Sequence, residues 1–436
     1  MAAYVETTKT GWGSRMGSSL RGVGTGFVML AAGLALLFWN EGRAVKTHKA
    51  LQEGAAAVTE ADPDRIDPAL DGRLVHFTAD VKTDRPLRDA WFGVELPALR
   101  MERRVEMWQW QESSSTSTKE NWGGSETTTT EYDYWKGWSE DRIDSAKFKV
   151  PDGHRNPAQF PVKGREIIAG KVTAGAYTVP PKWVATMGNL EPAELPSAET
   201  PLPEDAPAGM FRTAEGLYLP VHPKTAVQEV VATVTNTVEM TLADGTTESV
   251  DTVETVTNTV ETAASAAGVG AEPADPEIGD VRVRLYVAKP GRTSFVVRQE
   301  PAGRMAAWKS SNGREIRMIR TGEATAAEMF EGAEKGNRIF TWLLRLAGLL
   351  LTVFGIRSVL GPLAMLAAVV PFLKAILSAG IGFVSWVLGL GLSLVVVGIA
   401  WLTYRPLVGI PLLVAGIGLA VWLKVGRKAP PPASAE

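Results

Sequence analysis

The sequence predicts an α-helical membrane protein with four spans and a β-rich α+β extramembrane domain between the first and second span. Three observations support this fold class. Residues 22–40 carry no charge, residues 375–404 and 406–423 carry none, and a long polar middle separates the two apolar ends. An apolar helix of about 20 residues crosses the hydrocarbon core of a bilayer, and the cores of soluble domains rarely contain such runs.

The first span is predicted over 23–40, after a short polar segment at 1–22. The bulky residues 36–39 and the lack of a nearby Ala-x-Ala site favour an uncleaved signal anchor over the alternative, a cleaved signal peptide. The second span is predicted over 336–357, where Thr325 and Glu328 form a capping box that opens the helix leading into it.

The remaining spans are predicted at 381–403 and 406–424, followed by a cytoplasmic tail at 425–436. Segment 358–380 is apolar, but Pro362 and Pro371 are expected to break it, so it is predicted to be interfacial or re-entrant.

Basic residues orient the chain. Three of them close the last span, which predicts a cytoplasmic C-terminus: Lys424, Arg427 and Lys428. An even number of spans then places the N-terminus in the cytoplasm and the domain at 41–335 on the other side. Abundant Ala and Gly without cysteine favour a bacterial source, in which the domain would be periplasmic and the membrane the inner membrane.

Arg345 lies about 10 Å inside the second span, at a rise of about 1.5 Å per residue. An arginine at that depth faces protein or water, or snorkels to the headgroups. Glu41, at the outer end of the first span, is its expected partner. Together with Arg43 and Arg405, these residues are predicted to form a charged group at the outer membrane edge.

Glycines recur at intervals of seven in the last two spans. Small residues on one helix face let backbones approach closely, which favours packing within one chain; contact between subunits is the alternative. The glycines are Gly382 and Gly389, Gly391 and Gly398, and Gly409 and Gly416.

In the polar middle, residues 74–81 alternate as a strand does. Two further strands are predicted to form a Trp-rich hairpin whose tip, at 113–130, is a mobile or disordered Ser/Thr/Gly-rich loop. Its tryptophans either belong to the core, which we favour, or form a surface that meets lipid headgroups. They are Trp108, Trp110, Trp135 and Trp138.

A Thr/Val-rich stretch at 226–264 repeats the sequence Val-Thr-Asn-Thr-Val-Glu, and Asp244-Gly245 lies between the copies. Asp-Gly is a strong signal for a hairpin turn, so a long protruding β-hairpin suited to self-association or a partner is expected. The alternative is a helix, because valines between 250 and 260 also recur every three or four residues.

No motif for catalysis, a cofactor or a metal emerges. The chain has no cysteine, its four histidines are scattered, and its net charge of −3 gives no basic field for nucleic acid. The turn at 154–157 is expected to be structural. We therefore expect no enzymatic activity.

Several dispersed segments together resemble the LUMA (transmembrane protein 43) family. They are 40–47 after the first span, 104–112, residues 143–145 with 153–157, 279–283, and Trp401 with 404–406. The resemblance implies four spans around a large lumenal or periplasmic domain. It also implies a scaffold that self-associates and binds lipids and other membrane proteins, without an established enzymatic activity; stretch 226–264 departs from the family. The alternative function is a membrane-embedded enzyme or a transport or pore component.

Overall fold

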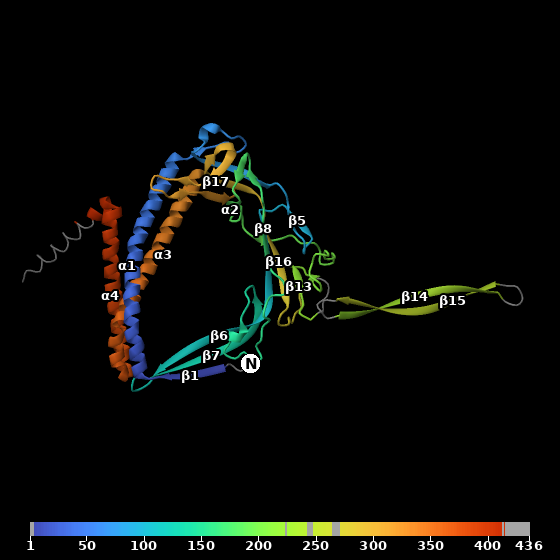
Figure 1. Cartoon of the computed structure of the whole chain (residues 1–436), viewed down its shortest axis with the longest axis horizontal. Coiled ribbons are helices and arrows are strands. Elements are labelled where there is room, and N and C mark those ends of the chain that lie inside the picture. Colours follow the sequence, from blue (N-terminus) through green and yellow to red (C-terminus); the bar gives the residue numbers. More distant parts are fainter. Residues whose placement is uncertain (1–3, 223–224, 242–246, 264–270, 412–413, 415–436) are drawn as a thin grey trace, which may run out of the picture.

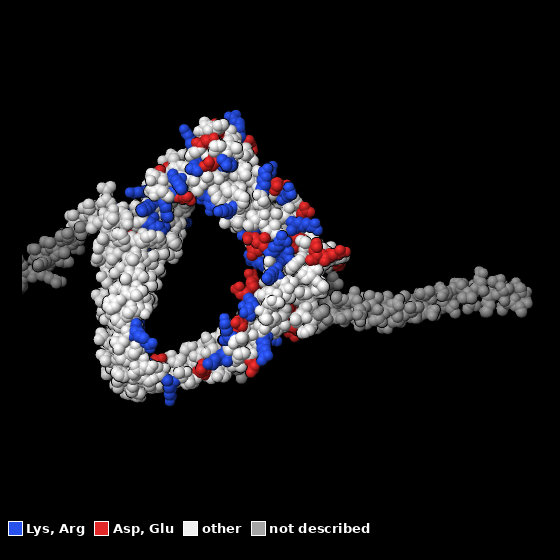
Figure 2. Space-filling model, viewed as in Figure 1, with Lys and Arg blue, Asp and Glu red and all other residues white. Residues whose placement is uncertain are grey.

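The three-dimensional structure, a computed structural model, describes residues 4–222, 225–241, 247–263, 271–411 and 414. Three long helices run side by side, and a β-rich domain arches away from one end of them and returns to the other (Figure 1). The chain thereby encloses an opening, which the space-filling view also shows (Figure 2). We call the helix ends close to Ala57 the upper ends and those close to Trp12 the lower ends.

The three helices are α1 (Trp12–Ala57), α3 (Ala326–Leu366) and α4 (Pro371–Tyr404). Each is long and apolar enough to cross a membrane. Helix α1, with 46 residues, extends for about 69 Å, so it projects beyond an apolar layer of about 30 Å. The chain continues as a helix over 406–411, but most of the expected fourth span, Gly416 and the tail at 425–436 lie outside the described residues.

Segment 358–380 is not a separate re-entrant element. Its first part is the end of α3, which contains Pro362, and its last part is the start of α4. Between them, η4 (Ala367–Val369) makes the turn. The prediction that Pro362 breaks the helix was wrong, since membrane helices tolerate proline where local adjustments satisfy the freed carbonyl. Pro371 is at the first helical position of α4, where its missing N–H costs nothing.

Glycines allow α1 and α3 to pack closely. A Cβ atom on Gly26 would come within 2.8 Å of the Gly355 carbonyl oxygen, and one on Gly33 within 2.8 Å of the Gly348 carbonyl oxygen. Only some glycines of the seven-residue repeat lie in contacts between helices. In α4, Gly389 packs on Val353 and a Cβ on Gly382 would lie 4.0 Å from the Arg357 guanidinium. No atom of the described residues lies within 4 Å of a Cβ on Gly391 or Gly398. Beyond α4, Gly409 lies against the backbone of residues 401 and 402.

We expect Gly33→Ala to lower the free energy of unfolding by about 1–3 kcal/mol, because the methyl group would overlap backbone atoms of α3. Gly398→Ala is the matched control and is expected to leave stability unchanged, since no atom of the described part of the chain lies within 4 Å of its Cβ. Thermal unfolding of both variants in detergent would measure the difference. Equal midpoints would show that α1 and α3 do not pack through Gly33.

The first sheet has eight strands in the order β1-β7-β6-β16-β13-β12, with β8 pairing with β6 and β11 with β16. Buried side chains alternate along its central strands, as the period of two requires. The strands are β1 (Tyr4–Thr10), β6 (Arg100–Glu120), β7 (Glu126–Ser139), β8 (Arg165–Ile168), β11 (Glu191–Pro192), β12 (Phe211–Arg212), β13 (Leu217–Leu219) and β16 (Val281–Ala288).

The second sheet has seven strands in the order β2-β3-β9-β10-β18-β17-β21. Pairing of β3 with β17 closes five of them into a small barrel, inside which Phe77 stacks on Tyr177 and Phe295. Residues 74–81 form part of strand β3, as predicted. Positions 75, 77, 79 and 81 are buried, but Leu74 and His76 are buried as well, so both faces of the first half of the strand are covered. The strands are β2 (Thr59–Glu60), β3 (Leu74–Thr83), β9 (Val172–Ala174), β10 (Tyr177–Val179), β17 (Arg292–Glu300), β18 (Arg304–Ala306) and β21 (Met318–Thr321).

Shorter elements complete the domain. Two small hairpins pair β4 (Leu87–Asp89) with β5 (Val94–Leu96) and β19 (Trp308–Lys309) with β20 (Glu315–Ile316). A short helix, α2 (Pro181–Val184), buries Trp183 and Val184, and single 3₁₀ turns occur at η1 (Pro68–Leu70), η2 (Ser145–Lys147) and η3 (Pro301–Gly303).

Stretch 226–264 is a hairpin of β14 (Thr225–Thr241) and β15 (Thr247–Ala263). The prediction of a β-hairpin is therefore confirmed, and the helical alternative is wrong. Its ladder runs unbroken from the pair Thr225 and Ala263 to the pair Thr241 and Thr247. The hairpin stands out from the rest of the molecule (Figure 1). The expected turn at Asp244-Gly245 lies outside the described residues.

The N-terminal segment and the Trp-rich hairpin differ from expectation. Segment 113–130 is not a mobile loop, because β6 and β7 remain paired up to Glu120 and Glu126. Strand β1 adds to this ladder along β7, and Thr and Ser suit such a pleated surface. Segment 1–22 is therefore not an isolated cytoplasmic tail, since residues 4–10 belong to the same sheet as the domain.

Candidate functional site

A buried charged cluster joins the three helices near their upper ends. The Arg345 guanidinium of α3 donates through Nε and Nη2 to the two Glu41 carboxylate oxygens of α1, at 2.6 and 2.9 Å. The Trp401 indole of α4 donates to the same carboxylate at 2.8 Å. Glu41 is fully buried, and Arg345 also lies 4.7 Å from the Trp342 ring. We call Glu41, Arg345 and Trp401 the membrane-edge cluster.

The ion pair between Glu41 and Arg345 is the one predicted from the sequence. The hydrogen bond from Trp401 to Glu41 was not predicted. Arg43 lies two residues after Glu41 on α1 and binds neutral oxygens instead of a carboxylate. It donates to Asn40 Oδ1, Asn337 Oδ1 and Thr341 Oγ1, and its guanidinium lies 4.8 Å from the Phe340 ring. Arg405 follows α4 half-buried and makes no side-chain hydrogen bond or ion pair with the described residues.

The membrane-edge cluster is suited to holding helices together. Both oxygens of Glu41 already accept charge-assisted bonds, which are the strong ones in a water-poor setting. Within the described part of the chain, no group of three or more His, Cys, Asp or Glu residues could hold a metal ion. The arrangement therefore locks α1, α3 and α4 in register through one carboxylate.

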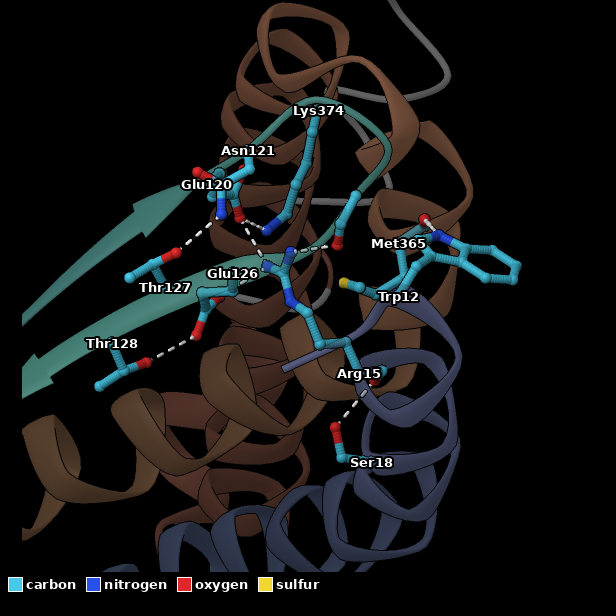
Figure 3. Close-up of polar contacts among 11 residues, drawn as sticks. Trp12, Arg15, Ser18, Glu120, Asn121, Glu126, Thr127, Thr128, Met365 and Lys374 are labelled. Carbon is cyan, nitrogen blue, oxygen red and sulfur yellow. Dashed lines mark hydrogen bonds and ion pairs between the residues drawn. The ribbon is translucent and has the colours of Figure 1, made fainter. Parts of the chain in front are cut away.

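A second polar cluster lies at the lower helix ends, where the tip of the β6–β7 hairpin meets them (Figure 3). Arg15 of α1 binds Glu120 and Glu126, both at 2.7 Å, and donates to the Gly124 carbonyl oxygen at 2.7 Å. Lys374 of α4 pairs with Glu120 as well. Arg15 is almost fully buried. We call Arg15, Glu120, Glu126 and Lys374 the clasp.

Backbone contacts reinforce the clasp. The Trp12 indole donates to the Met365 carbonyl oxygen at 2.9 Å, and the Gly123 N–H donates to the Val369 carbonyl oxygen at 3.0 Å. Gly124 has φ +77°, and a Cβ there would lie 2.4 Å from the Trp12 ring, so the position requires glycine for both reasons. The tip is thereby attached to α1, to α4 and to the η4 turn between α3 and α4.

The four tryptophans of the predicted hairpin do not form one surface. Trp108 and Trp138 face each other across the ladder with ring centroids 5.2 Å apart, and Trp110 is buried. Trp135 is 44% exposed. Sequence reasoning missed Trp122, which is 79% exposed at the tip beside the lower helix ends.

The turn at 154–157 is structural, as expected. The His154 ring lies between Trp110 and Tyr134, with centroids 4.6 and 4.1 Å away. Asn156 completes the edge of β6 by binding both the N–H and the carbonyl of Trp110. Burial, with help from the hydrogen bond to Glu112, raises the pKa of Tyr134 to about 12, so this phenol stays a donor.

Comparison with known proteins identifies relatives of this chain. The family model described as Transmembrane protein 43 matches residues 107–406. Transmembrane protein 43 of Rattus norvegicus is 26% identical over 91% of this chain and 88% of its own length. The Homo sapiens protein of that name is 25% identical over 97% and 94%, and the Drosophila melanogaster homolog 26% over 97% of each.

These relatives are animal proteins, so they support the family and leave the bacterial source as an expectation. No solved structure shows significant similarity to the chain. The family match covers well over half of the chain and includes the Trp-rich hairpin, α3, α4 and Arg405. This multi-pass membrane protein belongs to the Transmembrane protein 43 family.

Proposed function

We propose that this chain is an integral-membrane scaffold that self-associates and organises neighbouring lipids and membrane proteins through its β-rich domain. It works by binding, without a catalytic step. In a bacterium it would reside in the inner membrane, with the body of the domain in the periplasm.

The observation that carries the proposal is the β14–β15 hairpin. Its strands have 17 residues each, so it is about 56 Å long. Among the described strands it pairs only with itself, which leaves both edges open. An isolated two-stranded ribbon is marginally stable in water, and open edges are templates for another strand. A second chain that pairs along an edge would satisfy both requirements.

The helices connect this domain firmly to the membrane. Helix α1 continues without a break into the domain, where Ala50 and Leu51 pack with Leu74, Val296 and Phe330. Helix α3 begins there with the predicted capping box of Thr325 and Glu328. A partner bound to the domain would therefore be held at a defined position relative to the bilayer, as a scaffold requires.

Replacing residues 225–263 by a short Gly-Ser linker is expected to reduce the assembly to single chains, because the strand edges that join the copies are removed. Light scattering of the detergent-solubilised protein would give the mass. A hairpin shortened equally in both strands, by removal of residues 234–254, should associate more weakly than the full chain. A full-length protein that runs as a strict monomer would refute the proposal.

A further inference from the structure

A cavity of about 740 Å³ lies at the upper membrane edge, next to the membrane-edge cluster. It is bounded by α1, α3 and the chain that follows α4. Its lining includes three basic side chains on which the inference depends: Lys49 from α1, Arg338 from α3 and Arg405 after α4. The space-filling view shows blue side chains gathered at this end of the helices, above a long white surface (Figure 2).

Positive charge exceeds negative charge in this cavity. Lys49, Arg338 and Arg405 make no ion pair or side-chain hydrogen bond with any residue that the structure describes. The single acidic residue of the lining, Glu334, pairs with His48 at 3.1 Å, and Arg345 is neutralised by Glu41. Three cations that converge on one cavity attract an anion.

The lining also has an apolar side. Trp342 is 67% exposed, Leu407 91% and Val408 47%, and all three border the same cavity. Large apolar groups exposed at this level of a membrane protein meet acyl chains, while basic residues just above them meet headgroups. The combination fits a ligand with an anionic head and apolar tails better than a free anion.

We propose that this cavity is a binding site for an anionic phospholipid. Lys49, Arg338 and Arg405 surround the headgroup phosphate, and the acyl chains run down along Trp342 and Leu407. The site is independent of the scaffold proposal, because it does not involve the β14–β15 hairpin.

The test uses the full-length protein, delipidated in detergent, with phosphatidylglycerol or phosphatidylcholine added and bound lipid counted by native mass spectrometry. Phosphatidylglycerol should bind more tightly than phosphatidylcholine. The variant K49Q/R338Q/R405Q should lose about tenfold or more of that affinity, since each basic group near a membrane surface contributes. The single variant K49Q should show a smaller loss in the same direction.

The matched control is K82Q/K171Q/K182Q, which removes three exposed lysines of the β-rich domain that pair with no residue in the described ranges. It changes the net charge equally and should bind lipid as the parent does. Loss of affinity in the control as well, or equal binding of the two lipids, would overturn the proposal. Displacement of the lipid by millimolar inorganic phosphate would also overturn it, because it would identify a site for a free anion.

Discussion

A cysteine pair at positions 7 and 129 is expected to form a disulfide almost completely in native membranes. Thr7 and Thr129 lie directly opposite each other in the β1–β7 ladder. Opposed residues in such a ladder have Cα atoms about 4.5–5.5 Å apart, which suits a disulfide. The chain has no cysteine of its own, so the gel shift after mild oxidation reports this pair alone.

The matched control is the pair Thr7→Cys with Thr127→Cys, which is out of register because Thr127 pairs with Lys9. It should crosslink poorly. The experiment decides between two placements of the domain. If residues 41–335 all lie across the bilayer from the N-terminus, positions 7 and 129 never meet, and no disulfide forms in membranes with either pair.

Breaking the membrane-edge cluster should cause the largest loss of stability of any single substitution considered. Arg345→Met leaves the Glu41 carboxylate fully buried with only the Trp401 indole as a donor. Removing one partner of a buried ion pair costs about 3–5 kcal/mol. Glu41→Gln should cost less, since the Arg345 side chain is 18% exposed and can reach toward the headgroups.

The double variant E41Q/R345M is expected to recover part of the loss, because no unpaired buried charge remains. Thermal unfolding in detergent of the parent and the three variants would give a double-mutant cycle. Strict additivity of the two single effects would show that Glu41 and Arg345 are not coupled.

The features that could be predicted from the sequence are those with a local pattern or a distinctive composition. The uncharged runs identify the apolar helices, alternation identifies β3, and the pair of Thr325 and Glu328 identifies the start of α3. The pairing of Glu41 with Arg345 was also predictable, because a charge inside an apolar segment needs a partner and few candidates lie at that depth.

The clasp could not be predicted, and the reason is distance along the chain. Arg15 and Glu120 are 105 residues apart, and neither has a local pattern that distinguishes it from a solvated surface charge. Strand β1 is short and becomes a strand only because β7 offers an edge. Likewise, the sequence indicates only that Trp401 is an aromatic residue at the membrane interface. Its bond to Glu41 depends on how α4 packs against α1.

The closed outline of the chain constrains the surrounding lipid. The middle of the helices that border the opening is uncharged (Figure 2). The part of the β-rich domain opposite them, which we call the β-arm, carries charged groups along its inner edge (Figure 2). Acyl chains cannot solvate such an arm. While the contacts of the clasp are formed, a flat and unbroken bilayer cannot pass through the opening. The bilayer must end or curve there and present its headgroups to the β-arm.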